Sequence, residues 1–316
     1  MSETDKAAAK RKRATFGVVF LTIFLDMVGF SVIFPLFPAM LDHYLVRETA
    51  LGGGMLTDFV MSLQGLAFEG DSKNDAFRFE TVIFGGALGS LYAILQFFFA
   101  PIWGRLSDKI GRRPVLMFTL AGTCLGYGLW IFAGGFWILV LSRILGGMAS
   151  GNLSVATASI ADVTSRESRS KGMAFVGVAF GLGFIIGPAL GGFASQWSWG
   201  NGEGAVFGLN PFSLAALISF CLALVNWLWL VFSFKETLPM EKRESGNEPR
   251  PAIFQLRSVK SSAVTNTCLA YLCYMISFSG MEFTLTFLAV ERFSYDPIQI
   301  AKMFLLIGIT LIFAQG

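Results

Sequence analysis

Charged residues are scarce in this sequence, at 14% of 316 residues, whereas soluble proteins average about 25%. A single histidine, His43, cannot form a catalytic constellation by itself. The sequence has no phosphate-binding loop of the form G-x-x-x-x-G-K-[ST], and its four cysteines lie in apolar stretches without metal-ligand spacing. These deficits argue against a soluble domain, an ATP-driven pump and a membrane enzyme.

Long apolar runs take the place of the missing charge, and 54% of all residues are apolar. Eight runs approach the length of about 20 residues that a membrane-spanning helix needs, and they are too long and too continuous for the strands of a barrel. They cover residues 15–38, 82–103, 115–133, 136–160, 173–196, 211–234, 264–290 and 299–316. We therefore expect an all-α, multi-pass membrane protein.

Lysine and arginine are distributed unevenly among the connections. They precede the first run at residues 10–13 and collect after the second, fourth and sixth runs, whereas the connection 39–81 is acidic. Because basic residues mark cytoplasmic loops, we expect a cytoplasmic N-terminus, in the inner membrane if the protein is bacterial.

Two connections are long. Inside the outer loop 39–81, residues 52–67 carry apolar side chains at helical spacing, which predicts a short amphipathic helix resting on the outer surface, with a lid as the alternative. Residues 235–262 form a polar linker of mixed charge. This linker is expected to divide a six-span N-terminal bundle, residues 1–234, from the start of a second bundle, residues 263–316.

The connection after the second run reads Gly104-Arg-Leu-Ser-Asp108-Lys-Ile-Gly111-Arg112-Arg113. Its two glycines allow tight turns and close helix approach. Asp108 is one carboxylate among four cations, which suits an ion pair that can break and re-form. The preference for basic cytoplasmic loops explains the cations but not the spaced glycines and the aspartate.

The fifth run contains Gly183-Phe-Ile-Ile-Gly187-Pro188-Ala-Leu-Gly191-Gly192. Small residues one turn apart let helix backbones approach closely in lipid, and the proline introduces a kink. Generic helix packing is the alternative, because spaced glycines also occur in the second and fourth runs.

Three ionisable residues lie inside apolar runs, where charge is costly and usually functional: Asp26, Arg143 and Glu282. A carboxyl group that approaches and leaves a buried arginine can bind and release a proton. Asp26 and Arg143 are therefore candidates for proton or substrate coupling, with a permanent Asp–Arg pair or a pair satisfied by the backbone as the alternative. Both interpretations stay open for Glu282. Gln96, Asn152 and Tyr92 are further candidates for lining a polar cavity.

These motifs together resemble the drug:proton antiporters of the major facilitator superfamily, in particular the tetracycline-efflux type and related tetracycline-transporter-like proteins. The resemblance is carried by Asp26, Gly29 and Pro35 in the first run, by the Gly104–Arg113 motif, and by the residues around Glu282. It implies two six-helix bundles around a central cavity, with alternating access.

The resemblance also implies roles for particular residues. Arg112 is expected to pair with Asp162 at the end of the fourth run, and Asp108 to meet the N-terminus of a helix from the second bundle. These three residues would form a cytoplasmic gate that holds the outward-facing state. The Gly183–Gly192 stretch corresponds to a motif of antiporters, with Ala174 where that motif has an earlier glycine.

The function expected from the sequence is export of small organic or drug-like compounds in exchange for protons. The proton gradient stands in place of a cofactor. The expected partners are a small-molecule substrate, protons and the lipid bilayer, with no nucleic acid, and the complete protein is expected to be monomeric. Because the sequence stops at Gly316, the second bundle is expected to be incomplete and the chain a fragment, with a partner half supplied from elsewhere as the alternative. A sugar or metabolite symporter, or a membrane scaffold that transports nothing, remain alternatives.

Overall fold

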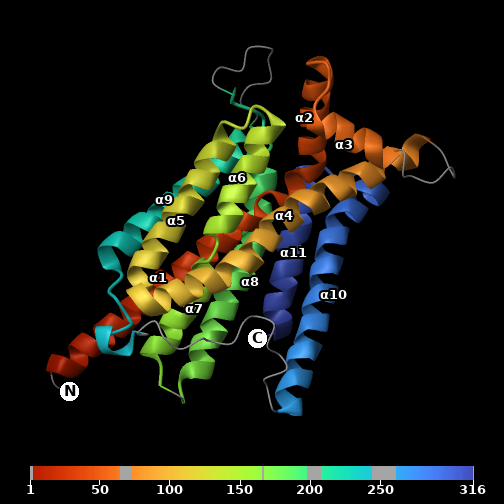
Figure 1. Cartoon of the computed structure of the whole chain (residues 1–316). Helices are drawn as coiled ribbons and strands as arrows, with labels where there is room; N and C mark the ends of the chain where they lie inside the picture. Colours follow the sequence, from red (N-terminus) through yellow and green to blue (C-terminus); the bar gives the residue numbers. More distant parts are fainter. Residues whose placement is uncertain (1–2, 65–72, 166, 198–207, 244–260, 316) are drawn as a thin grey trace.

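A computed structural model of the chain describes residues 3–64, 73–165, 167–197, 208–243 and 261–315 (Figure 1). Every regular element within these ranges is a helix. In chain order the elements are α1 (Glu3–Ser31), η1 (Phe34–Leu36), α2 (Phe37–Ala50), α3 (Met55–Gln64), α4 (Lys73–Ile110), α5 (Arg112–Ile131), α6 (Phe136–Ala149), α7 (Asn152–Val163), α8 (Arg169–Ala194), α9 (Ser213–Ser233), η3 (Met240–Lys242), α10 (Ser262–Phe293) and α11 (Pro297–Gln315).

Seven helical stretches in the described ranges are long and apolar enough to cross a membrane. They are Thr15–Ala50, Val82–Ile110, Arg112–Ile131, Phe136–Val163, Arg169–Ala194, Ser213–Ser233 and Ser262–Val290. A further apolar stretch, Pro297–Thr310 in α11, is shorter and coincides with the eighth expected run. The predicted all-α membrane fold is confirmed.

α1 lies at the centre of the bundle, where it packs against α7, α8 and α9 (Figure 1). α5 packs against α6 and α9, α4 against α6, and α11 covers the remaining side of α8. We call the end at which α4 meets α5 the Arg112 end, and the opposite end, where α2 lies, the Tyr44 end. Each end has its own buried apolar cluster, one around Tyr44 and Trp130 and the other around Ile23 and Leu116.

The glycines of α8 let two other helices approach it closely. A Cβ atom added to Gly183 or Gly187 would meet the backbone oxygens of Phe24 and Val28 in α1, and one on Gly191 that of Val32, directly after α1. A Cβ on the adjacent Gly192 would instead meet the backbone of Pro297 and the Cβ of Ala301 in α11. The small residues of α8 therefore serve two interfaces on different faces of one helix.

The Gly104–Arg113 motif is not a loop over most of its length, which corrects the expectation from its charges. α4 continues to Ile110, and the chain turns at Gly111, whose φ of 111° strongly favours glycine. Basic and acidic side chains do not end a helix, whereas a left-handed glycine does. Gly104 is not at a tight approach either, because a Cβ there would lie 3.9 Å from the Ser154 Oγ atom.

The expected long loop 39–81 is likewise wrong within the described residues. The first span continues through η1 into α2, and α3 follows after a short glycine turn. The carboxylate of Glu48 accepts hydrogen bonds from the N–H groups of Leu56 (2.9 Å) and Thr57 (3.1 Å), and so caps α3. The short helix expected in 52–67 is therefore present, and it packs against α2 and α4.

The fourth expected span, 136–160, is broken rather than continuous. α6 ends at Ala149 and α7 begins at Asn152, with Ser150 and Gly151 between them. The side chain of Gln96 donates a hydrogen bond of 3.2 Å to the Ser150 carbonyl oxygen that the break leaves free. Such a break is tolerated at membrane depth because a neighbouring helix satisfies the backbone.

α10 touches the rest of the protein near the Tyr44 end. Phe287 is buried there, and a Cβ on Gly85 of α4 would lie 2.7 Å from its ring. The rings of Phe283 and Phe37 have centroids 6.3 Å apart. The other part of α10, Ser262–Met281, is almost entirely exposed, and Figure 1 shows it standing apart from the bundle towards the Arg112 end.

Candidate functional site

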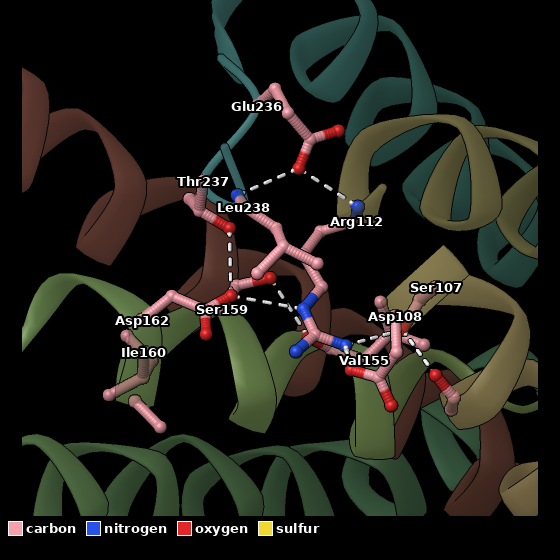
Figure 2. A network of polar contacts seen from close by, with 12 residues as sticks. Ser107, Asp108, Arg112, Val155, Ser159, Ile160, Asp162, Glu236, Thr237 and Leu238 are labelled. Atoms are coloured by element: carbon pink, nitrogen blue, oxygen red, sulfur yellow. Dashed lines mark hydrogen bonds and ion pairs between the residues drawn. The ribbon is translucent and has the colours of Figure 1, made fainter. Parts of the chain in front are cut away.

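Arg112 is the centre of a polar network at the Arg112 end (Figure 2). Its guanidinium group contacts Asp108 at 2.7 Å and Asp162 at 3.0 Å, and it donates a 2.6 Å hydrogen bond to Ser107. The arginine is only 6% exposed, so these contacts replace water around its charge. One cation thus joins the end of α4, the start of α5 and the end of α7.

Local structure explains the arrangement. Asp108 and Arg112 lie four residues apart on either side of the turn at Gly111, so the carboxylate reaches back to the guanidinium. Asp162 lies in the last turn of α7, where a negative charge is unfavourable with respect to the helix dipole. The pairing with Arg112 and a 3.3 Å hydrogen bond from the Thr237 hydroxyl offset that cost. The expected contact between Arg112 and Asp162 is thus present, while its role as a gate stays a prediction.

Glu236 is the member of this network that sequence reasoning missed. Its carboxylate accepts hydrogen bonds from the backbone N–H groups of Arg112 (2.9 Å), Arg113 (3.2 Å) and Leu238 (3.0 Å). A carboxylate at the first N–H groups of α5 satisfies donors that the helix itself leaves free and matches the helix dipole. Arg243 lies 3.7 Å away on the other side of the carboxylate.

The position of Glu236 explains why it was missed. It lies two residues after the end of the sixth expected run, at 211–234, and was counted with the polar linker 235–262. No pattern in the sequence indicates its role, because only the fold brings this acid beside the basic start of α5. Arg113, the last residue of the motif, holds the same region in place by donating a 2.7 Å hydrogen bond to the Val231 carbonyl oxygen.

A second polar cluster lies inside the bundle, around Asp26 of α1. Asp26 is 4% exposed and Asn152 is fully buried. The Asn152 side-chain nitrogen donates to the Asp26 carboxylate at 3.3 Å and to the Thr123 hydroxyl at 3.4 Å. Asn152 is the first residue of α7, so the helix break places this amide beside the acid.

Arg143 of α6 is also buried, with 4% of its surface exposed. Its guanidinium carbon lies 4.6 Å from the centre of the Trp130 ring and 5.9 Å from that of Tyr127. Its Nε atom donates a long hydrogen bond of 3.5 Å to the Ser142 hydroxyl. No acid among the described residues forms an ion pair with it. The alternative of a permanent Asp26–Arg143 pair is therefore wrong for this conformation.

The remaining candidates are distributed around these two clusters. Tyr92 is buried and its backbone lies against Gly147 of α6, while Gln96 binds the Ser150 carbonyl group as described above. Tyr127 was not singled out from the sequence; its hydroxyl group lies against Gly29, three residues after Asp26. Glu282 lies in α10, but its side chain is outside the described part of the structure.

Comparison with known proteins gives a consistent picture. The family model described as Major Facilitator Superfamily matches residues 19–316. The human major facilitator superfamily domain-containing protein 10 is 34% identical over 96% of this chain and 67% of its own length. The tetracycline resistance protein, class E, of Escherichia coli is 31% identical over 96% of this chain and 64% of its own length.

Solved structures agree with these matches. The crystal structure of the human organic anion transporter MFSD10 (TETRAN) superposes with a TM-score of 0.72 at 32% identity, over 95% of this chain and 70% of that chain. A D-xylose–proton symporter superposes with a TM-score of 0.57 at 13% identity, which shows the fold alone. The chain thus spans about two thirds of the length of the curated relatives it matches.

Proposed function

Because the chain belongs to the major facilitator superfamily, and is therefore a multi-pass membrane transporter rather than an enzyme, we propose that it exports small organic compounds in exchange for protons. Transport would proceed by alternating access between two bundles of helices, of which this chain provides the first and the start of the second. Protons and the substrate are the proposed ligands, and the proton gradient supplies the driving force.

The observation that carries the proposal is the Asp26–Asn152 pair. A carboxyl group at this depth has no cation beside it among the described residues, and its one hydrogen bond comes from a neutral amide. The Asn152 Oδ1 atom is buried and has no hydrogen-bond partner in the described structure.

An amide is well suited to both protonation states of this acid. The nitrogen of Asn152 donates to the carboxylate, and after rotation of the amide its oxygen accepts from the protonated acid. Gaining or losing a proton therefore leaves Asp26 with a partner in either state. A permanent ion pair would instead favour the charged state alone.

The surroundings support organic compounds as substrates. Half-buried phenylalanines from α1, η1 and α8 lie close to one another in space, and those of α1 and η1 follow Asp26 along the chain. Phe30 and Phe34 have ring centroids 5.2 Å apart, and Phe34 and Phe184 5.6 Å. Aromatic surfaces of this kind bind amphipathic molecules. One relative is described as an organic anion transporter and another as a tetracycline resistance protein, so we propose drug-like compounds that include organic acids.

The two ends of the molecule support an inward-open state. We assign the Arg112 end to the cytoplasm, because basic residues collect there, and this places the N-terminus inside. α10 meets α4 and η1 near the Tyr44 end and is exposed along its cytoplasmic half. In the outward-facing state, the Asp108–Arg112–Asp162 network would receive a helix of the second bundle.

Flux into proteoliposomes, with and without an imposed pH gradient, tests the proposal. Tetracycline and an aromatic carboxylate serve as probes, and Asp26→Asn as the variant. We expect the pH gradient to drive antiport by the unchanged protein and not by Asp26→Asn, because the amide binds no proton. Asp58→Asn, which removes an exposed acid of α3, is the matched control and should retain pH-driven flux.

Two results would contradict the proposal. Substrate that moves in the same direction as protons would indicate symport, which is the mode expected of a sugar or metabolite transporter. Full pH-driven flux by Asp26→Asn would show that protons are carried elsewhere. Equal flux with and without a pH gradient would remove proton coupling altogether.

A further inference from the structure

Arg143 is a buried cation that has no counter-charge among the described residues of the bundle. It is 4% exposed, and no acid of the described residues forms an ion pair with it. Its hydrogen bond to Ser142 is long, at 3.5 Å, and uses the Nε atom only. Arginines at membrane depth normally pair with an acid or with backbone carbonyl groups, so this guanidinium retains unused donors.

Trp130, which stacks with Arg143, carries a second unused donor. The tryptophan is fully buried, yet its Nε1 atom has no hydrogen-bond partner in the described structure. Two other tryptophans of the bundle are satisfied: Trp103 donates to the Met148 carbonyl oxygen at 2.7 Å and Trp227 to that of Met117 at 2.9 Å. A buried indole N–H without an acceptor is unusual, and each such group calls for an explanation.

The two unused donors belong to side chains in contact. The guanidinium carbon lies 4.6 Å from the centre of the Trp130 ring. One group that accepts hydrogen bonds and carries negative charge would satisfy both. A planar carboxylate matches the fork of a guanidinium and still leaves a lone pair for the indole N–H.

Asp26 does not fill this role. Its carboxylate accepts the hydrogen bond of Asn152, whereas Tyr127 lies with its ring 5.9 Å from the Arg143 guanidinium and its hydroxyl against Gly29. Asp26 and Arg143 therefore have separate partners. This separation leaves Asp26 for the proton and Arg143 for a different anion.

We infer that Arg143 and the Trp130 indole N–H form a subsite for the carboxylate group of the transported compound. The inference rests on the proposed function, and it names the substrates as organic acids with a carboxylate beside a flat apolar body. The flat part lies against aromatic side chains, and the carboxylate takes the place of the missing counter-charge. Arg143 and Trp130 are both buried in this conformation, so their neighbouring side chains must move for the carboxylate to reach them.

Binding to the purified chain in lipid nanodiscs tests the inference directly. The probes are 2-naphthoate and its neutral amide, 2-naphthamide, which share a ring system and differ in charge. We expect the unchanged protein to bind the carboxylate at least about tenfold more tightly than the amide. One hydrogen bond to a charged group accounts for a difference in affinity of this size. Equal binding of the two probes would overturn the inference.

Trp130→Phe is the decisive variant, because it keeps an aromatic ring under Arg143 and removes only the N–H group. It should lower the preference for the carboxylate about tenfold and leave binding of the amide unchanged. Trp227→Phe is the matched control, since it removes an N–H that already has an acceptor in Met117. Arg143→Lys keeps the charge but loses the planar fork, and should weaken carboxylate binding without abolishing it.

Three further outcomes decide against the inference. One is that Trp130→Phe keeps the full preference for 2-naphthoate over 2-naphthamide. Another is that Trp227→Phe loses as much of this preference as Trp130→Phe does. The third is competition by chloride: if sodium chloride displaces 2-naphthoate and sodium gluconate does not, the subsite belongs to an inorganic anion. Failure of the subsite is distinguishable from failure of the proposed function. If Trp130→Phe binds both probes like Trp227→Phe while the unchanged protein still shows pH-driven flux of 2-naphthoate, the subsite is wrong and the proposed function stands.

Discussion

Replacing Glu236 by glutamine tests whether a residue of the linker holds the start of α5. The carboxylate accepts the N–H groups of Arg112 and Leu238 through one oxygen and that of Arg113 through the other. Glutamine keeps one acceptor oxygen but presents an NH2 group in place of the second. The N–H of Arg113 then loses its acceptor, at the positive end of the α5 helix dipole.

The magnitude follows from these contacts. Loss of one charge-assisted hydrogen bond costs about 1.5–3 kcal/mol. The pair with Arg243, at 3.7 Å and with both side chains more than a fifth exposed, adds at most about 1 kcal/mol. We therefore expect Glu236→Gln to lower the free energy of unfolding by about 2 kcal/mol, or about thirtyfold in the unfolding equilibrium.

Unfolding in mixed micelles with increasing denaturing detergent measures this difference, with Glu241→Gln as the control. Glu241 lies in the same linker and is exposed, so its replacement should change the free energy by less than about 0.5 kcal/mol. Equal stability of the two variants would refute the reasoning. It would show that the linker follows the position of α5 without stabilising it.

Two glycine contacts give further predictions. Gly191→Ala places a Cβ against the backbone of Val32, directly after α1, and should cost about 1–3 kcal/mol of stability by overpacking. Gly181→Ala, with no atom within 4 Å of the new Cβ, should be neutral or stabilising in the same unfolding assay. Gly85→Ala places a Cβ 2.7 Å from the ring of Phe287 and should loosen the contact between α4 and α10, seen as faster hydrogen exchange of residues 283–290 by mass spectrometry. Gly86→Ala makes only ordinary contacts and is the control. Unchanged hydrogen exchange in Gly85→Ala would contradict the idea that this contact holds α4 and α10 together at the Tyr44 end.

Some features of the site could be predicted because they depend on neighbours in sequence. Asp108 and Arg112 are four residues apart, and the turn between them requires a glycine at position 111. The pairing of Arg112 with Asp162 was also expected, although the two residues are 50 positions apart, because the resemblance of the motif implied it.

Other features were outside the reach of sequence patterns. Glu236 lies 124 positions from Arg112, and no local signal connects a linker acid with the start of a distant helix. The break at Ser150 and Gly151 was hidden in a continuous apolar run, since hydrophobicity reports burial in lipid but not backbone continuity. The separate partners of Asp26 and Arg143 depend on which way buried side chains point.

The sequence by itself determined that this protein is a helical membrane transporter of the major facilitator superfamily. Its apolar runs admit only helices in a bilayer, because every backbone polar group must be satisfied there and the runs are too long and too continuous for barrel strands. Only the tertiary structure decided that Asp26 is hydrogen-bonded to an amide, while Arg143 lies over the Trp130 ring and forms no ion pair with an acid of the described residues. Residues from four different helices meet at these contacts, and packing in three dimensions, not spacing along the chain, determines which side chains become partners.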